Sequence, residues 1–301
     1  MSRKKNIITT VVLVVILLVG LSVMLYPTVS NWWNSKTQSR VVANYQQAVS
    51  DLDEEEVERI LNEAREYNRE LAQLASPLTA YEQIEGYEDI LDITGTGVMG
   101  FISIPQINVE LPIYHGTSES VLNIAVGHLQ GSSLPVGGST THAVISAHRG
   151  LPSAELFSDL DQLVEGDRFT ITVLTETFTY EVDKISIVLP SETENLSIEN
   201  GKDYVTLMTC TPYGINTHRL LVRAHRVAND EAESEVTALA DAVQIDSLNV
   251  VPFIAAPLVL ILLIYWFFGG RKKDKFPHSD PLKALEQIKK LNDNSNDDKG
   301  G

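Results

Sequence analysis

The chain has 301 residues, 44% of them hydrophobic, and a formal net charge of -17 at pH 7. Its length suits one or two folded domains with a substantial core. The acidic balance argues against a nucleic-acid partner, because binding a phosphate backbone requires clustered Lys and Arg.

Residues 7–26 form the first candidate element, an apolar run without a charged residue. A run of about 20 residues covers the hydrocarbon core of a bilayer. Basic residues at 3–5 favour the cytoplasmic side, while Trp32 and Trp33 suit the outer interface. A cleaved signal peptide would have a shorter apolar stretch and a small-residue cleavage site. We therefore predict an uncleaved transmembrane helix at 7–26, preceded by a cytoplasmic N-terminus at 1–6.

Residues 36–75 show helical periodicity, with apolar residues recurring every three or four positions. Ser50 is the predicted N-cap of a second helix, because the acids at 51–56 would stabilise its first turn. These acids lack the glycine and the spacing of a calcium loop. The second helix should end before Pro77, within an extracytoplasmic helical region at 27–95 that also holds any lid.

From about residue 96 the chain changes to short segments rich in Val, Ile, Thr and Tyr, separated by turn residues. Regular short strands with few helical insertions predict a closed or nearly closed β-barrel at 96–228. One insertion, 153–163, is expected to be a short helix. The expected strands are FISIP, NVELPIYH, HAVISAH, RFTITVL, FTYEVDKISIVL, YVTLMTC and RLLVRAHRV.

A second apolar run lies at 251–268, after an acidic, Ala-rich stretch at 229–250 that we interpret as a linker. The run ends in aromatic residues and a basic flank at 271–275, which is a stop-transfer pattern. A buried core helix is the alternative, and the length and flanking charges argue against it. We predict a two-pass protein of the cell membrane, with the N-terminus and the 269–301 tail in the cytoplasm and the barrel outside.

Cys210 is the single cysteine, and it ends a predicted strand directly before a turn. A lone cysteine is usually a small buried hydrophobe, yet outside the cell it risks oxidation without a structural benefit. A strand end is also where a rigid scaffold can present a reactive group. A nucleophilic thiol needs a neighbouring base or cation. Cys210 is therefore a candidate nucleophile, with a buried structural thiol as the alternative.

Arg219 opens the next predicted strand, so a hairpin would bring it beside Cys210, where its fixed donors could hold an oxyanion. A surface ion pair is the plainer interpretation of Arg219. His148 ends a strand at a loop and could act as acid and base, with His218 as second choice. The residues alone do not decide among six histidines: His115, His128, His142, His148, His218 and His225.

TLMTC at 206–210 resembles the TLxTC signature of sortases. The longer string TLMTCTPYGINTHRLLVRAHR is similar to the active-site region of class C sortases of Gram-positive bacteria, which polymerise pilins. HAVISAHRGLPSAELFSDLDQL resembles the segment that carries their catalytic histidine, and GVMGFISIPQINVELPIYHGT resembles their first strands. The resemblance covers roughly residues 40–228, the order His, Cys, Arg agrees, and two membrane segments also fit class C.

This resemblance implies a mainly β fold, an eight-stranded sortase-type barrel with N-terminal helices and two flanking transmembrane helices. It implies His148, Cys210 and Arg219 as the catalytic set. Cys210 would cleave an LPxTG-like sorting motif between Thr and Gly, and a lysine amine of another pilin would receive the acyl group. The implied partners are pilin subunits and the membrane, and no cofactor or metal is implied.

Class C sortases usually carry a lid with an Asp-Pro-aromatic motif over the active site. The segment SPLTAYEQIEGYEDILDITG at 76–95 contains no such triplet. Either Tyr81 or Tyr87 covers the site in its place, or the site has no blocking lid. Thr209, beside the nucleophile, is a further candidate for substrate binding.

Three rival interpretations remain. A housekeeping sortase would join surface proteins to a cell-wall precursor instead of a pilin lysine. A secreted cysteine protease would release its product to water, although the sequence lacks the cysteine-protease signatures. A non-enzymatic, membrane-tethered pilus-base protein would bury Cys210, so its thiol would react slowly with a labelling reagent.

Overall fold

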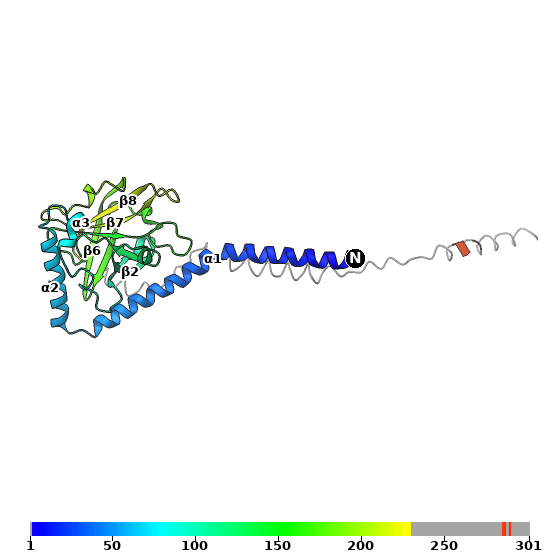
Figure 1. Cartoon of the computed structure of the whole chain (residues 1–301), viewed down its shortest axis with the longest axis horizontal. Helices are drawn as coiled ribbons and strands as arrows, with labels where there is room; N and C mark the ends of the chain where they lie inside the picture. The colour runs from blue at the N-terminus through cyan, green and yellow to red at the C-terminus, as the bar shows by residue number, and fades with distance from the viewer. Residues whose placement is uncertain (1, 230–284, 287–288, 290–301) are drawn as a thin grey trace, which may run out of the picture. The chain divides into compact units, whose positions relative to one another are not determined.

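The computed structural model describes residues 2–229, 285–286 and 289. Four α-helices occur among the residues before the barrel and within it: α1 (Ser2–Ser50), α2 (Glu54–Leu71), α3 (Pro77–Ala80) and α4 (Glu119–Leu122). Figure 1 shows α1 and α2 meeting at an angle beside the barrel. The predicted second membrane span at 251–268 lies outside the described residues, as do nearly all of the linker and the tail.

The described residues form one closed barrel with the strand order β1-β2-β3-β4-β7-β8-β6-β5. Its strands are β1 (Val98–Ile104), β2 (Val109–His115), β3 (Val126–His128), β4 (Thr141–Ser146), β5 (Arg168–Val173), β6 (Glu176–Val188), β7 (Asp203–Thr211) and β8 (His218–Arg226). The pairing of β5 with β1 closes the sheet, and two pairs, β2 with β3 and β4 with β7, are parallel. The predicted mainly β, eight-stranded barrel is confirmed.

Strand β3 is the strand that the sequence pattern missed. It has only three residues and a central glycine, Gly127, so it shows neither alternation nor β-branched enrichment. A Cβ added at Gly127 would lie 2.2 Å from the carbonyl oxygen of Gly116. The close approach of the chain at this parallel pair therefore requires glycine.

Helix α1 joins the predicted membrane segment and the first outer helix in one uninterrupted element, Ser2–Ser50. Among the described residues it is the one helix long and apolar enough to cross a membrane. Its far end packs on β1 through the buried side chains of Val42 and Tyr45. The Tyr45 hydroxyl donates to Met99 O (3.0 Å) and accepts from Leu174 N (2.9 Å), which ties the anchor helix to the barrel.

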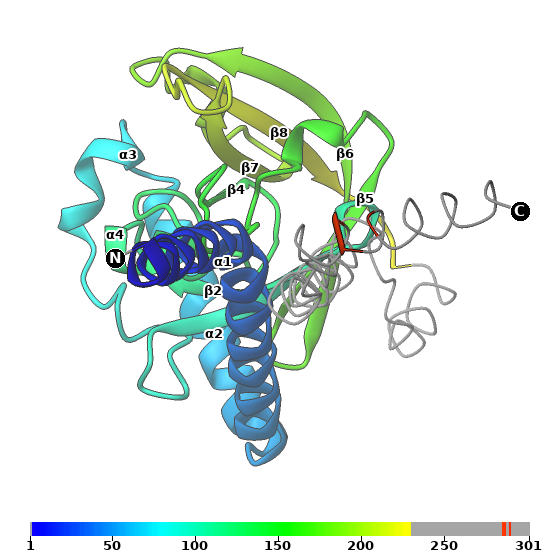
Figure 2. The ribbon, with the colours of Figure 1, turned by 90° about the vertical axis from the view of Figure 1, so that its right-hand side faces the viewer.

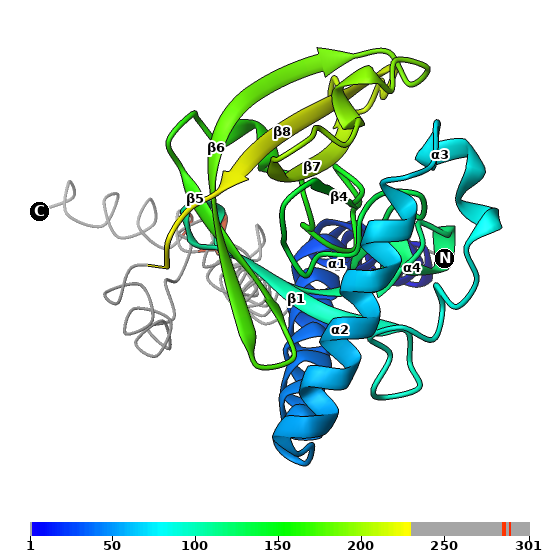
Figure 3. The same cartoon turned by 90° about the vertical axis from the view of Figure 1, so that its left-hand side faces the viewer.

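Helix α2 begins three residues later than predicted. Its N-cap is Asp53, whose carboxylate accepts from Glu56 N at 2.8 Å. Ser50 is not the cap, because it still belongs to α1 and its hydroxyl donates back to Gln47 O. The helix ends at Leu71, before the expected boundary near Pro77. The apolar stripe of α2 packs into the core that fills the barrel. Figures 2 and 3 show that strands β6, β7 and β8 lie on the opposite side of the barrel from the turn that joins α1 and α2.

The predicted short helix at 153–163 is wrong. The segment consists of turns, with a single 3-10 turn at Leu160–Gln162. Leu156 adopts φ +43°, in the left-handed region that a helix cannot contain. The amides on either side of Leu156 bond to distant parts of the chain: Glu155 N donates to Asn31 Oδ1 and Phe157 N donates to His148 O.

Candidate active site

The β7–β8 hairpin brings two of the predicted residues together. Cys210 is the penultimate residue of β7, and the antiparallel register pairs it directly with Arg219 of β8. Opposite residues of an antiparallel pair have Cβ atoms about 4.5–5.5 Å apart. The hairpin predicted from the sequence is therefore present, and both side chains are half-buried.

His148 reaches the same level of the sheet through the parallel pairing of β4 with β7. Ser146 pairs with Met208, and one residue further Ala147 N donates to Met208 O (3.2 Å). Continuing this register by one more residue brings His148 beside Cys210. His148 itself is half-buried, in the loop that follows β4.

Thr209 supports this parallel extension from inside the barrel wall. Its hydroxyl donates to Ala147 O at 2.9 Å, and the residue is only 1% exposed. Thr209 therefore fixes the backbone between β4 and β7, next to His148 and Cys210. Its side chain is buried in the barrel wall, and its contribution to substrate binding stays a prediction.

The pleat of the strands places the three candidates on one face. Side chains alternate between the two faces along a strand. In β4, β7 and β8 the interior side chains include Ile145, Leu207 and Val222, and the opposite face carries Val144, Met208 and Leu221. We call this opposite face the outer face. Cys210 lies two positions after Met208 and Arg219 two before Leu221, so both belong to the outer face, and His148 continues the alternation of Val144.

The hydrogen bonds of Arg219 hold its guanidinium at the β7–β8 loop. Its Nη1 donates to His218 O (3.2 Å) and to Asn216 O (3.4 Å). A guanidinium carries five N–H donors, so these contacts use a small part of its capacity. Arg219 is thus a fixed donor group at the edge of the outer face, beside a thiol.

Three of the other histidines are structural. His115, His128 and His142 are buried, and each has both ring nitrogens within hydrogen-bond distance of protein atoms. Burial lowers the pKa of His142, and it lowers that of His128 to about 4. Burial thus disfavours the charged form of His128 and His142, and the half-buried His148 and His218 lie nearer the thiol.

The loops that follow His148 and Cys210 contact each other, which the sequence pattern did not reveal. Tyr213, in the β7–β8 loop, covers Gly150, where an added Cβ would meet the Tyr213 ring at 2.6 Å. Gly150 also has φ +75°, so glycine is required on both grounds. Arg149 stacks near the same ring, 5.9 Å from its centroid, and pairs with Asp161.

The segment 76–95 covers the outer face through Leu78. This half-buried side chain packs against the apolar cluster of Val144, Val188, Leu196 and Leu221. Tyr87 lies instead in the core, 3% exposed, with its hydroxyl 2.9 Å from His128 Nδ1. Tyr81 packs against the main core. Both tyrosines contact the main core, whereas Leu78 contacts the cluster on the outer face. That Tyr81 or Tyr87 covers the site stays a prediction.

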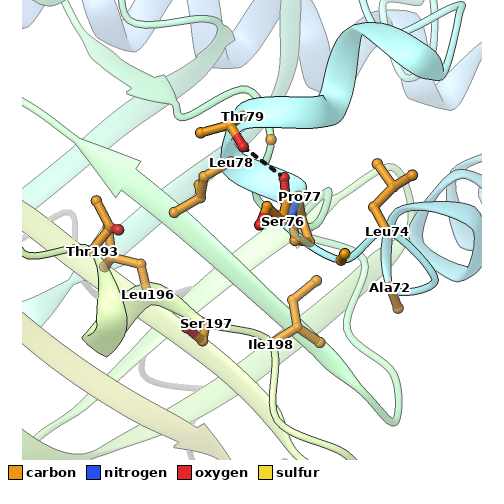
Figure 4. A pocket seen from close by; sticks show the side chains of 12 residues that line it. Ala72, Leu74, Ser76, Pro77, Leu78, Thr79, Thr193, Leu196, Ser197 and Ile198 are labelled. Atoms are coloured by element: carbon orange, nitrogen blue, oxygen red, sulfur yellow. Dashed lines mark hydrogen bonds between the residues drawn. The ribbon is translucent and has the colours of Figure 1, made fainter.

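A cavity of about 310 Å³ adjoins Leu78. Figure 4 shows it between the turn that links α2 to α3 and the loop before β7, where Thr193, Leu196 and Ile198 face Leu78. Thr79 Oγ1 donates to Ser76 O (3.2 Å) and stabilises the turn. Leu196, a member of the outer-face cluster, is among the residues that line the cavity, and Cys210 is not.

Comparisons with known proteins bear on the fold of this chain. The sortase domain family matches residues 102–227. The solved structure of sortase C1 from Streptococcus agalactiae is 51% identical, with a TM-score of 0.58, and the match covers 64% of this chain and 100% of that one. Sortase C from Streptococcus pneumoniae is 42% identical (TM-score 0.54; 63% and 97% covered).

A curated relative, sortase A from Streptococcus agalactiae, is 32% identical over 130 residues. That alignment covers 42% of this chain and 52% of the relative. The chain therefore spans about half the length of this curated relative, whereas it spans the solved sortase C chains almost completely.

Proposed function

The chain belongs to the sortase family, and from this premise we propose that it is a membrane-anchored cysteine transpeptidase of class C that assembles pili. The observation that carries the proposal is the direct pairing of Cys210 with Arg219 at the end of the β7–β8 hairpin. His148, at the same level of the neighbouring strand, supplies the acid and base.

In the first half of the reaction Cys210 attacks the Thr carbonyl of an LPxTG-like motif as a thiolate. The carbonyl oxygen becomes an oxyanion, which the guanidinium of Arg219 stabilises. The bond from Thr to Gly then breaks, and His148 gives a proton to the leaving amine. The acyl group remains on Cys210 as a thioester.

In the second half a lysine amine of another pilin attacks the thioester. His148 takes a proton from the attacking amine, the carbon–sulfur bond breaks, and an isopeptide bond joins the two subunits. The thioester conserves the free energy of the cleaved peptide bond, so the transfer requires no further energy source. Support for pilin as the substrate comes from the likeness to Streptococcus pneumoniae sortase C, whose solved structure addresses pilin substrate specificity.

A housekeeping role is the second candidate, favoured by the likeness to sortases A. The two differ in the acceptor amine, which is a pilin lysine in one and a cell-wall precursor in the other. The full-length protein in detergent micelles should be incubated with LPxTG-containing pilin and, separately, with the precursor. An SDS-resistant ladder of pilin supports the class C proposal, and a single precursor adduct without a ladder supports the housekeeping role.

For the membrane topology we propose two spans, 7–26 and 251–268, with the barrel outside the cell. The apolar first half of α1 supports the first span, and the sequence pattern supports the second. A reporter fused after Gly301 should then be active in the cytoplasm, and one inserted near Asp230 should be active outside. A C-terminal reporter found outside would remove the second span.

A further inference from the structure

One face of α1 bonds to the barrel through a row of carboxamides. Asn31, Asn34 and Gln38 recur at the spacing that places side chains on one side of a helix. The row leads into Val42 and Tyr45, which pack on β1. These two apolar residues already fasten the helix to the barrel. The carboxamides of Asn31 and Asn34 instead bond to residues of another loop.

Two of the carboxamides bind the loop that follows β4. Asn34 Nδ2 donates to Ser153 O at 2.7 Å. Asn31 makes two bonds to Glu155: its Nδ2 donates to the carboxylate, and its Oδ1 accepts from the backbone N–H, both at 3.0 Å. Each Asn thus satisfies a backbone group of the loop.

The same loop is bonded to the backbone of His148. Phe157 N donates to His148 O (3.3 Å), and Phe157 is fully buried. Between Glu155 and Phe157 lies Leu156 at φ +43°, a conformation unfavourable for leucine. Contacts on both sides hold this residue, so a shift at Glu155 is passed through Leu156 to the carbonyl of His148.

We propose that Asn31 and Asn34 are positioning residues, through which the membrane-anchor helix sets the place of His148 beside Cys210. The inference rests on the proposed function, because it assigns proton transfer to His148. The membrane anchor is then part of the catalytic geometry as well as a tether. A displacement of about 1 Å in a catalytic group can lower a rate by about 100-fold.

The test compares two near-isosteric variants of the full-length protein in micelles. Asn34→Leu removes the bond to Ser153 O. Gln38→Met removes a bond of the same kind and length, from Gln38 Nε2 to Ile124 O at 2.7 Å, on the same helix but away from the loop. Both variants should lose similar thermal stability, which controls for helix docking.

We expect Asn34→Leu to lower single-turnover acylation of an LPxTG-like peptide by about 10- to 100-fold, and Gln38→Met to leave it within about twofold of the wild-type rate. The pH profile of acylation should change shape in Asn34→Leu, because the proton-transfer group has moved. A loss of folded protein would lower the acylation rate by the same factor at every pH and leave the shape of the pH profile unchanged. Equal losses in both variants, or an unchanged profile in Asn34→Leu, would overturn the proposal.

Hydrogen exchange separates this inference from the proposed function. The amides of Glu155 and Phe157 should exchange faster in Asn34→Leu and at the wild-type rate in Gln38→Met. If the wild-type protein acylates no peptide, the proposed function fails while this measurement still decides the coupling. Unchanged exchange at both amides in Asn34→Leu would show that the helix does not hold the loop.

Discussion

At the scale of single residues, the candidate site holds the thiol of Cys210 and the guanidinium of Arg219 at paired positions of two adjacent strands. Their pairing follows from a hairpin whose turn contains Pro212 and Gly214, so the nine-residue separation of Cys210 and Arg219 in sequence becomes direct opposition in the sheet. An arginine in an exposed ion pair would contribute about 0–1 kcal/mol to stability. The hydrogen bonds recorded for Arg219 go to two carbonyls of its own loop, and this leaves donors for a substrate.

Replacing Arg219 with lysine tests whether geometry or charge matters. Lysine keeps the charge but offers a point donor on a flexible stem instead of a rigid fork. We expect Arg219→Lys to fold with an unchanged Tm and to retain a reactive thiol. Single-turnover acylation of an LPxTG-like peptide should fall by about 100-fold, the usual effect of losing one oxyanion donor.

Arg223→Lys is the matched control for this change. Arg223 lies on the same strand but pairs with Asp183 and Glu199, away from Cys210. Its replacement should leave acylation nearly unchanged. Near-normal acylation in Arg219→Lys would remove Arg219 from the catalytic set and direct attention to His218.

At the scale of elements, the sequence predicted what is periodic and missed what depends on distant contacts. Regular alternation located seven strands, and the apolar stripe located α2. The pattern could not locate β3, whose three residues are specified by the close approach of Gly127 to Gly116. It also predicted a helix at 153–163, because the bonds from α1 that hold this loop come from residues about 120 positions earlier.

The covering segment shows the same limit. The aromatic lid that the family resemblance implies points to Tyr81 and Tyr87 in the segment 76–95. Both rings pack toward the core, and Leu78 lies on the outer face. The segment 76–95 packs against two surfaces, the main core and the outer face. This tertiary packing decides which of its side chains face the barrel, and no local sequence pattern encodes it.

Leu78 should limit access to Cys210. Leu78 packs against the cluster that contains Val144 and Leu196 as a half-buried aliphatic side chain, and truncating it to alanine removes about 1–2 kcal/mol of packing. The open form of the segment should then become about 5- to 30-fold more populated. We predict that Leu78→Ala accelerates thiol labelling of Cys210 by about this factor.

Tyr81→Ala is the comparison for this experiment, because its ring packs away from the outer face. It should label Cys210 at nearly the wild-type rate. If Leu78→Ala also labels at the wild-type rate, the segment does not gate the thiol, and the site is open.

At the scale of the whole molecule, buried polar groups join the N-terminal region to the barrel. His128 is fully buried, with Tyr87 Oη at 2.9 Å from Nδ1 and Ser133 O at 2.8 Å from Nε2. Tyr87 in turn accepts from Gly116 N. This network fastens the segment after α3 to the barrel, and burial of the imidazole disfavours its charged form.

Stability should therefore fall in mild acid. Burial lowers the pKa of His128 from 6.5 to about 4, so between these values the unfolded chain binds more protons than the folded one. The contribution is complete above about pH 6.5 and is lost as the pH falls toward 4, up to about 3 kcal/mol. The measurement is Tm against pH.

His128→Gln should flatten this acid dependence. His142 adds a slope of the same sign, since burial also lowers its pKa, so some dependence remains in the variant. An acid slope identical to that of the wild type in His128→Gln would contradict the assignment.

The most direct test of the account as a whole is the covalent intermediate. The full-length protein is mixed with an LPxTG-like peptide, quenched in acid, digested and analysed by mass spectrometry. We predict that the acyl fragment ending in Thr is attached to Cys210, and that Cys210→Ala forms neither adduct nor polymer while keeping its fold, since this small truncation costs on the order of 1 kcal/mol. Adduct or polymer formed by folded Cys210→Ala would contradict the assignment of Cys210 as the nucleophile.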